Sequence, residues 1–316
     1  MRKFLKRLIL FALFMASFYV FVIGITGIVR PSGIPNLPYF KGSYGHLFTR
    51  SHEAIEYADV DILVMGSSRA YRGFDPRIFE QHGLRIFNFG SSAQSPVQSY
   101  YLANQYLDSL DPELVVIEVF PEGFATDGVE SALDFLANKP IDWNSVKMAF
   151  EINHVKVYNV LVLALAREWL GMDHGFKEAL KRDYDTYISG GFVEKSSEFP
   201  PRLSTAPNPR EIQFKDFQKE AFANLLELLR KKQIDYILVE APTTRARYES
   251  ITNHPEIESF LHKHGQYVNF NERLPLVDSL HFYDHSHLNQ HGVEIFNGAF
   301  IEWLKEEGFY ERLRSE

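Results

Sequence analysis

The stretch Asp61-Ile-Leu-Val-Met-Gly-Ser-Ser-Arg-Ala70 contains a short apolar run that stops abruptly at a glycine and two serines. Such a run, β-branched in part, is typical of a strand buried on both faces of a parallel sheet. Gly66 permits a backbone conformation that a side chain would obstruct, and Ser67 or Ser68 can cap the helix or loop that follows. Because ligands bind at the carboxyl ends of strands in open α/β sheets, a serine here suits either chemistry or capping.

Further apolar runs along the chain predict the rest of the fold. Strands are expected near residues 60–65, 84–89, 114–120, 236–239 and 267–270, and helices near 96–110, 217–229, 256–264 and 293–303. Strands that alternate with helices favour a mainly parallel sheet covered on both faces. The sequence therefore predicts an α/β fold, a three-layer sandwich around a sheet of about five strands.

Residues 124 to about 212 break this alternation, because no strand and helix pattern is visible there. We interpret the segment as a mostly helical insertion. Its most apolar part, residues 154–170, is expected to be a helix packed on the domain, with a lid or a partner surface as the alternative.

The N-terminus has the pattern of a membrane anchor. Four basic residues precede an uncharged, mostly apolar run from Leu8 to Val29, which is about the length needed to cross a bilayer. A cleaved signal peptide is the alternative, but its apolar core would be shorter. The positive-inside rule then predicts a single-pass protein of the cell membrane, with a cytoplasmic N-terminus and residues 30–316 in the periplasm or outside the cell.

This interpretation divides the chain into three parts. Residues 1–29 form the basic tip and anchor, residues 30–50 form a spacer rich in proline, and residues 51–316 form one large domain. The net charge of −8 includes the four basic residues of the tip, so the remainder carries −12 and does not favour nucleic acid as a partner. The absence of cysteine excludes disulfides, thiolate metal ligands and cysteine nucleophiles.

A second informative stretch, His281-Phe-Tyr-Asp-His-Ser-His-Leu-Asn-Gln-His-Gly292, precedes the last predicted helix. Asp284 and His287 can lie side by side, so that the carboxylate orients the imidazole and leaves its other nitrogen free to act as a base. The four histidines also allow a zinc site as an alternative. We do not favour a metal, since Asn289 and Gly292 disfavour a regular helix through the cluster.

With these residues in view, the chain resembles the SGNH, or GDSL-like, hydrolase superfamily across roughly residues 58–306. More narrowly, it resembles membrane-anchored members that serve envelope acylation, such as the D-alanylation protein of lipoteichoic acid synthesis and the alginate O-acetylation proteins. Gly66-Ser67-Ser68 matches the first family block, Asn88-Phe89-Gly90 the second and Asp284-x-x-His287 the last. The resemblance implies an SGNH or flavodoxin-like fold.

The same resemblance implies roles for individual residues. Ser68 would be the nucleophile, His287 the general base and Asp284 the group that orients it, while the N–H groups of Ser68 and Gly90 would form an oxyanion hole. Arg69, Ser91 and Asn289 are candidates for substrate binding; Arg69 is otherwise expected to be a surface charge.

One family block is missing. The asparagine that normally donates to the oxyanion after the third strand is not present in Glu118-Val-Phe-Pro-Glu122. The sequence therefore predicts either an extracytoplasmic serine esterase or O-acyltransferase that acts on acyl esters, acetyl above all, of an envelope polysaccharide or polymer, or an inactive scaffold or glycan-binding protein of the same fold. The resemblance implies no cofactor, and suggests a membrane-bound O-acyltransferase as a partner.

Overall fold

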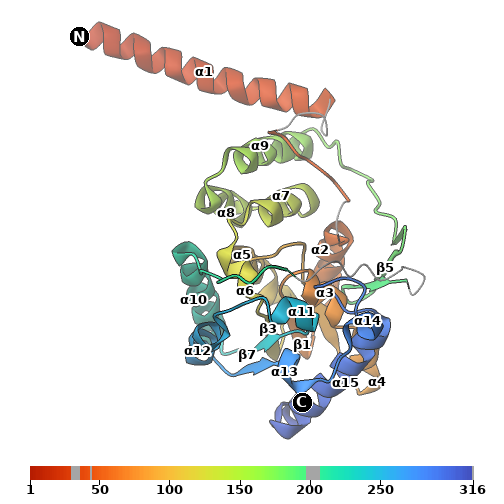
Figure 1. The fold of residues 1–316 in the computed structure, drawn as a ribbon. Coiled ribbons are helices and arrows are strands. Elements are labelled where there is room, and N and C mark those ends of the chain that lie inside the picture. The colour runs from red at the N-terminus through yellow and green to blue at the C-terminus, as the bar shows by residue number, and fades with distance from the viewer. Residues whose placement is uncertain (30–35, 43–44, 197–206, 315–316) are drawn as a thin grey trace.

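The computed structural model describes residues 1–29, 36–42, 45–196 and 207–314 (Figure 1). Its centre is a parallel sheet in the order β2-β1-β3-β7-β8. The strands are β1 (Ile62–Met65), β2 (Ile86–Asn88), β3 (Leu114–Glu118), β7 (Asp235–Glu240) and β8 (Tyr267–Asn269). Each of the five strands begins and ends within two residues of its predicted run. The order is that of flavodoxin-like folds, in which the switch point lies between β1 and β3.

Alternate residues of each strand enter two separate cores. Leu63 and Val115 point into the core under α5 (Pro96–Leu110), α10 (Asp216–Lys231) and α12 (His254–His264). Ile62 and Val116 point to the opposite core, where they pack with α4 (Pro76–Gln81), α15 (Gln290–Glu306) and α16 (Phe309–Leu313). Because each face of the sheet is covered by helices, the predicted three-layer α/β sandwich is confirmed.

Short helices begin directly after several strands at their carboxyl ends. They are α3 (Ser68–Gly73) after β1, α6 (Pro121–Ala125) after β3, α11 (Arg245–Tyr248) after β7 and α13 (Phe270–Arg273) after β8, and α14 (Asp278–His281) follows α13. The carboxyl edge of the sheet is therefore lined by helix starts, whose first N–H groups have no partner within their own helix.

The insertion contains both helices and a sheet. Helices α7 (Val129–Asn138), α8 (Trp143–Ile152) and α9 (Val155–Trp169) pack on one another, and α9 coincides with the predicted apolar helix. Strands β4 (Lys181–Arg182), β5 (Asp185–Ile188) and β6 (Phe192–Lys195) then form an antiparallel sheet. The sequence did not predict this sheet because its strands are too short to show a clear alternation of apolar and polar residues.

The predicted spacer at residues 30–50 is partly wrong. Residues 30–35, 43 and 44 lie outside the described residues, but Leu37 and Tyr39 are buried in the core. Helix α2 (Leu47–Glu56) begins inside the predicted spacer, and its fully buried Arg50 donates to the carbonyl of Gly191 at 2.9 and 2.7 Å. Residues 36–42 and 45–50 are therefore part of the domain.

Helix α1 (Arg2–Val29) is apolar and almost entirely exposed. Its mean hydropathy of 2.6 over an 18-residue window and its length are sufficient to cross a membrane. In Figure 1 it projects beyond the domain and lies against α9, the outermost helix of the insertion. The expected apolar N-terminal helix is therefore present.

The turn after β1 requires glycine, and this requirement can be tested. Gly66 has φ +154°, and a Cβ there would lie 2.6 Å from Cβ of Glu118. Gly66→Ala is expected to lower the free energy of unfolding by about 1 to 3 kcal/mol through overpacking, measured by urea denaturation. Gly298→Ala is the matched control: it lies in α15 with open space around it, and it should raise stability by roughly 1 kcal/mol. Equal effects of the two substitutions would contradict this account of the turn.

Candidate active site

The two serines after β1 have different surroundings. Ser67 is the N-cap of α3: its Oγ accepts from the N–H of Arg69 at 3.2 Å and donates to Oε2 of Glu118 at 2.9 Å. Its N–H also donates to Oε2 of Glu118, at 3.1 Å. Ser68 is the first residue of the helix, partly exposed, and its hydroxyl takes no part in capping. Of the two serines, Ser67 is therefore the cap, and the hydroxyl of Ser68 is available for chemistry.

Ser68, His287 and Asp284 lie in one chain of hydrogen bonds. Nε2 of His287 is 2.7 Å from Oγ of Ser68, and Nδ1 of His287 is 2.9 Å from each carboxylate oxygen of Asp284. A carboxylate only accepts, so the hydrogen sits on Nδ1 and Nε2 accepts the serine hydroxyl. This is the arrangement in which a histidine can take a proton from a serine.

The charge states of the pair suit that transfer. Burial lowers the pKa of His287, as do the charges of Arg72 and Arg69, against the opposing effect of Asp284. Burial alone would raise the pKa of Asp284, but hydrogen bonds from His287 and from the N–H of Ser286 lower it overall. At neutral pH the imidazole is therefore neutral and able to accept a proton, and the carboxylate is charged.

The loop that carries Asp284 and His287 is held at both ends. Phe282 and Leu288 form an antiparallel bridge, so that the loop closes on itself. Asn289 then caps α15 by accepting from the N–H of Gly292 at 3.0 Å. A Cβ at Gly292 would lie 2.3 Å from the carbonyl oxygen of His281, so only glycine allows this approach. The loop is fixed to the last helix, which positions His287 over Ser68.

The candidate oxyanion donors are the N–H groups of Ser68 and Gly90. The N–H of Ser68 has no carbonyl partner within α3, because it belongs to the first turn. The N–H of Gly90 instead donates to Oδ1 of Asn88 at 3.1 Å. Gly90 packs directly under α3, where a Cβ would lie 2.7 Å from the backbone N of Tyr71. The second donor is thus close to the serine helix but is engaged by Asn88.

The family's asparagine donor is missing after the third strand, and Glu118 occupies this region. Glu118 also explains the position of Arg69. The expectation that Arg69 is a surface charge is wrong: it is 4% exposed and pairs with Oε1 of Glu118 at 2.9 Å. Its guanidinium also lies 4.2 Å from the ring centre of Phe120. The sequence could not show this, because Glu118 and Phe120 belong to the neighbouring strand and its loop.

Two further candidates for substrate binding have structural roles. Ser91 is fully buried, and its Oγ donates to Oε1 of Gln94 at 2.8 Å. Asn289 caps α15 through Oδ1, and its Nδ2 donates to the carbonyl of Leu280 at 2.8 Å. The positions of both side chains are explained by these contacts within the domain.

The other histidines of the 281–292 stretch have separate partners: the rings of His281 and His291 lie against each other, with centroids 5.1 Å apart. Nδ1 of His281 accepts from the N–H of Val277 at 2.7 Å, and Nδ1 of His285 lies 3.2 Å from Oγ1 of Thr244. Within residues 1–29, 36–42, 45–196 and 207–314, no group of three or more His, Asp or Glu side chains is arranged to hold a metal ion. His287 itself is hydrogen-bonded to Asp284 and Ser68.

The small sheet of the insertion contributes residues to one side of the candidate site, which the sequence did not predict. Arg72 on α3 makes two hydrogen bonds to Asp185 on β5, at 3.0 and 2.8 Å, and Lys195 on β6 donates to the same carboxylate at 3.0 Å. The ring of Tyr283 stacks on His287, with centroids 5.4 Å apart and an interplanar angle of 8°. Arg72 lies one helical turn after Ser68, and this spacing could have identified it from the sequence as a neighbour of the site. No sequence pattern indicated Asp185.

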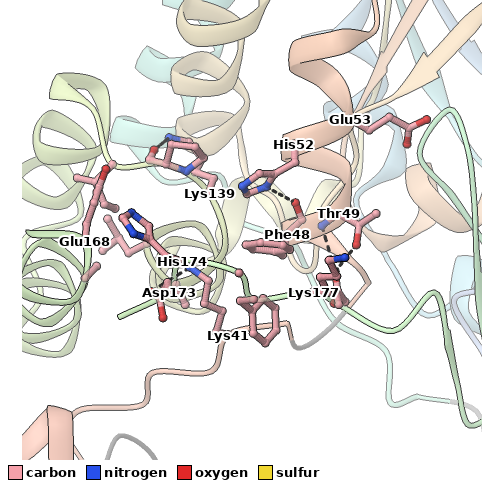
Figure 2. Close-up of a pocket in the computed structure, with 18 of the residues that line it drawn as sticks. Lys41, Phe48, Thr49, His52, Glu53, Lys139, Glu168, Asp173, His174 and Lys177 are labelled. Atoms are coloured by element: carbon pink, nitrogen blue, oxygen red, sulfur yellow. Dashed lines mark hydrogen bonds and ion pairs between the residues drawn. The ribbon is translucent and has the colours of Figure 1, made fainter. Parts of the chain in front are cut away.

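A cavity of about 850 Å³ lies elsewhere, between α2, α9 and the segment that follows α9. Figure 2 shows Lys139, Glu168 and His174 on one side of it and Phe48 and His52 of α2 on the other. The lining residues include neither Ser68 nor His287. The cavity is therefore distinct from the candidate active site.

Comparisons with known proteins give structural matches of low similarity. No protein-family model matches the chain, and no curated protein matches it by sequence. A GDSL-like lipase from Bacteroides thetaiotaomicron aligns with a TM-score of 0.41 and 13% identity over 84% of this chain and 100% of its own. A Bacteroides fragilis protein provisionally assigned as an acylhydrolase aligns with a TM-score of 0.40 and 12% identity over 86% and 99%. These likenesses concern the fold and carry no information on the substrate.

The hydrogen-bond chain predicts a pH profile. Because His287 must be neutral to accept a proton and its pKa is lowered, the reactivity of Ser68 should rise with pH through an inflection below about 6.5, the ordinary value for histidine. The rate of labelling by a fluorophosphonate between pH 4.5 and about 8 measures this. His285→Gln should leave the inflection in place. An inflection well above 7 would contradict the assigned base.

Proposed function

We propose that this protein is an extracytoplasmic serine esterase or O-acyltransferase with Ser68 as its nucleophile. The observation that carries the proposal is the continuous hydrogen-bond chain from Asp284 through His287 to the hydroxyl of Ser68. A serine hydroxyl is a weak nucleophile until a neighbouring base removes its proton, and the base needs a third group to orient it. These three side chains supply those roles.

The reaction would proceed in two halves. Oγ of Ser68 attacks the ester carbonyl while Nε2 of His287 takes the hydroxyl proton, and Asp284 stabilises the resulting imidazolium. His287 then gives that proton to the departing alkoxide, which leaves an acyl ester on Ser68. In the second half, His287 removes a proton from water or from an acceptor hydroxyl, the new oxygen attacks the acyl ester, and Ser68 regains its proton.

The negative charge on the carbonyl oxygen would be met by N–H groups. Ser68 supplies the first, and Gly90 supplies the second after releasing Asn88. Glu118 accepts hydrogen bonds from Ser67 and pairs with Arg69, so it holds the serine turn and does not replace the missing asparagine donor. Removal of one oxyanion donor costs about 10² to 10³ in turnover, so we expect a slow or specialised enzyme.

We infer the location and substrate class from the N-terminal helix and from the envelope-acylation proteins that the sequence resembles. An anchored domain outside the cytoplasm would meet polymers of the cell envelope, whose hydroxyls carry small acyl esters. The substrate would be an acyl ester, acetyl above all, on such a polymer, with a membrane-bound O-acyltransferase as donor partner and no organic cofactor. A second candidate function is an inactive scaffold or glycan-binding protein, favoured by the engagement of Gly90 with Asn88.

The nucleophile can be identified by covalent labelling. A fluorophosphonate should label the full chain in detergent, and Ser68→Ala should abolish both labelling and hydrolysis of an acetyl ester. Ser67→Ala is the matched control: it removes the hydroxyl that caps α3, at a cost of about 1 kcal/mol, but keeps the N–H that donates to Glu118, so Ser68 should still be labelled. EDTA should have no effect on labelling. If Ser68→Ala kept full activity, the assignment of the nucleophile would be wrong. If the wild type remained unlabelled, the inactive scaffold would be favoured.

The anchor can be tested separately. The protein is expected to keep its N-terminus and to stay with membranes after an alkaline carbonate wash, because the exposed apolar surface of α1 is stable only in hydrocarbon. Western blotting with N-terminal and C-terminal tags measures both properties. A shortened chain in the soluble fraction would show that α1 is a cleaved signal sequence.

A further inference from the structure

Helix α9 is mostly apolar, with Lys156, Arg167 and Glu168 as its charged residues, and only part of its apolar surface is covered. Toward the domain it buries Val157, Val160, Leu161 and Ala164. A large apolar helix surface that no part of the domain covers is typical of contact with a partner or a membrane. α9 lies at the outside of the domain, beneath α1 (Figure 1), so the nature of its remaining surface needs an explanation.

One side of α9 contacts α1. The hydroxyl of Tyr19 donates to Oδ1 of Asn159 at 2.7 Å. A Cβ at Gly27 would lie 2.7 Å from both terminal methyl groups of Leu163, so glycine allows the two helices to pack closely. Tyr19, Ile23 and Gly27 share one face of α1 at four-residue spacing, and Ile23 and Gly27 are its two buried residues.

The next side of α9 is an apolar stripe formed by Val155, Val162, Leu165 and Trp169, of which Val162 is partly buried against the core and the other three are exposed. At 3.6 residues per turn these four positions fall within a sector of about 80°, directly beside the sector that contacts α1. Trp169 is 86% exposed, Val155 50% and Leu165 43%. Phe150 of α8 extends the stripe, since it is 65% exposed and its ring lies 5.4 Å from that of Tyr158.

We propose that the α9 stripe is inserted in the outer leaflet of the bilayer that α1 spans. Tyr19 lies ten residues before the end of α1, a distance of about 15 Å, so α9 runs beside the part of the span that lies in hydrocarbon. The stripe is continuous with the apolar surface of α1 and would meet the same acyl chains. Burial of a tryptophan and aliphatic side chains in lipid accounts for their exposure in the isolated chain.

The insertion would therefore form a second membrane contact for the catalytic domain. A single helix leaves a domain free to rotate about its linker, whereas a second contact formed by α9 fixes its tilt. Since α9 packs on α7 and α7 packs on α2, this membrane contact is joined to the domain and hence to the carboxyl edge of the sheet that carries Ser68. The proposal depends on α1 being retained, but it is independent of the chemistry at Ser68.

Fluorescence quenching by lipid tests the proposal without changing the core. The chain contains three tryptophans: Trp143 and Trp169 are exposed, and Trp303 is buried between Phe300 and Phe309. Full-length Trp143→Phe and Trp143→Phe/Trp169→Phe are reconstituted in phosphatidylcholine vesicles, with and without lipid brominated on the acyl chains. The difference between the two variants reports on Trp169 alone, and the double variant is the matched control.

Brominated lipid should quench a large part of the Trp169 emission, and that emission should be blue-shifted, while Trp303 remains unaffected. Quenching of Trp169 by aqueous iodide and not by brominated lipid would overturn the proposal and leave the stripe in water. Protection from both quenchers would overturn it in favour of a protein partner or a second copy. Recovery of both variants in carbonate-washed vesicles confirms that α1 is inserted, so loss of the anchor is recognised separately.

Discussion

The contact between Ser67 and the buried carboxylate of Glu118 determines the geometry of the serine turn. Glu118 accepts from the N–H and the hydroxyl of Ser67, while the hydroxyl of Ser67 in turn accepts from Arg69 and starts α3. A hydroxyl that caps a helix is not available as a nucleophile, and the capping role falls on Ser67 alone. Ser68 is consequently presented at the switch point of the sheet, with its hydroxyl directed to His287.

The insertion acts on this site from one side and contacts the N-terminal helix on the other. Asp185 of its small sheet pairs with Arg72 and also accepts from Lys195, and the charge of Arg72 helps to keep the pKa of His287 low. Its helix α9 packs on α1. A segment that interrupts the strand and helix alternation is therefore integrated into the domain at both ends, and it connects the candidate active site to the N-terminal helix.

The sequence predicted those features that depend on local patterns. The five parallel strands were recognisable because each is a short, mostly apolar run, and Asp284 and His287 because they lie three positions apart in one loop. Features that depend on distant partners were not recognisable. Arg69 is buried because Glu118 lies on a neighbouring strand, and Arg72 pairs with Asp185 across 113 positions of sequence. The engagement of the Gly90 N–H by Asn88 depends on backbone geometry that no residue pattern encodes.

The most direct test of the central claim is to trap the acyl-enzyme. Full-length protein mixed with an activated acetyl ester, quenched in acid and digested, should yield one acetyl group on the peptide that contains Ser68, as measured by tandem mass spectrometry. Asp284→Asn should form this adduct slower by about four orders of magnitude, because the imidazole then favours the wrong tautomer. Turnover of the ester without an adduct on Ser68, or an undiminished rate in Asp284→Asn, would contradict the account.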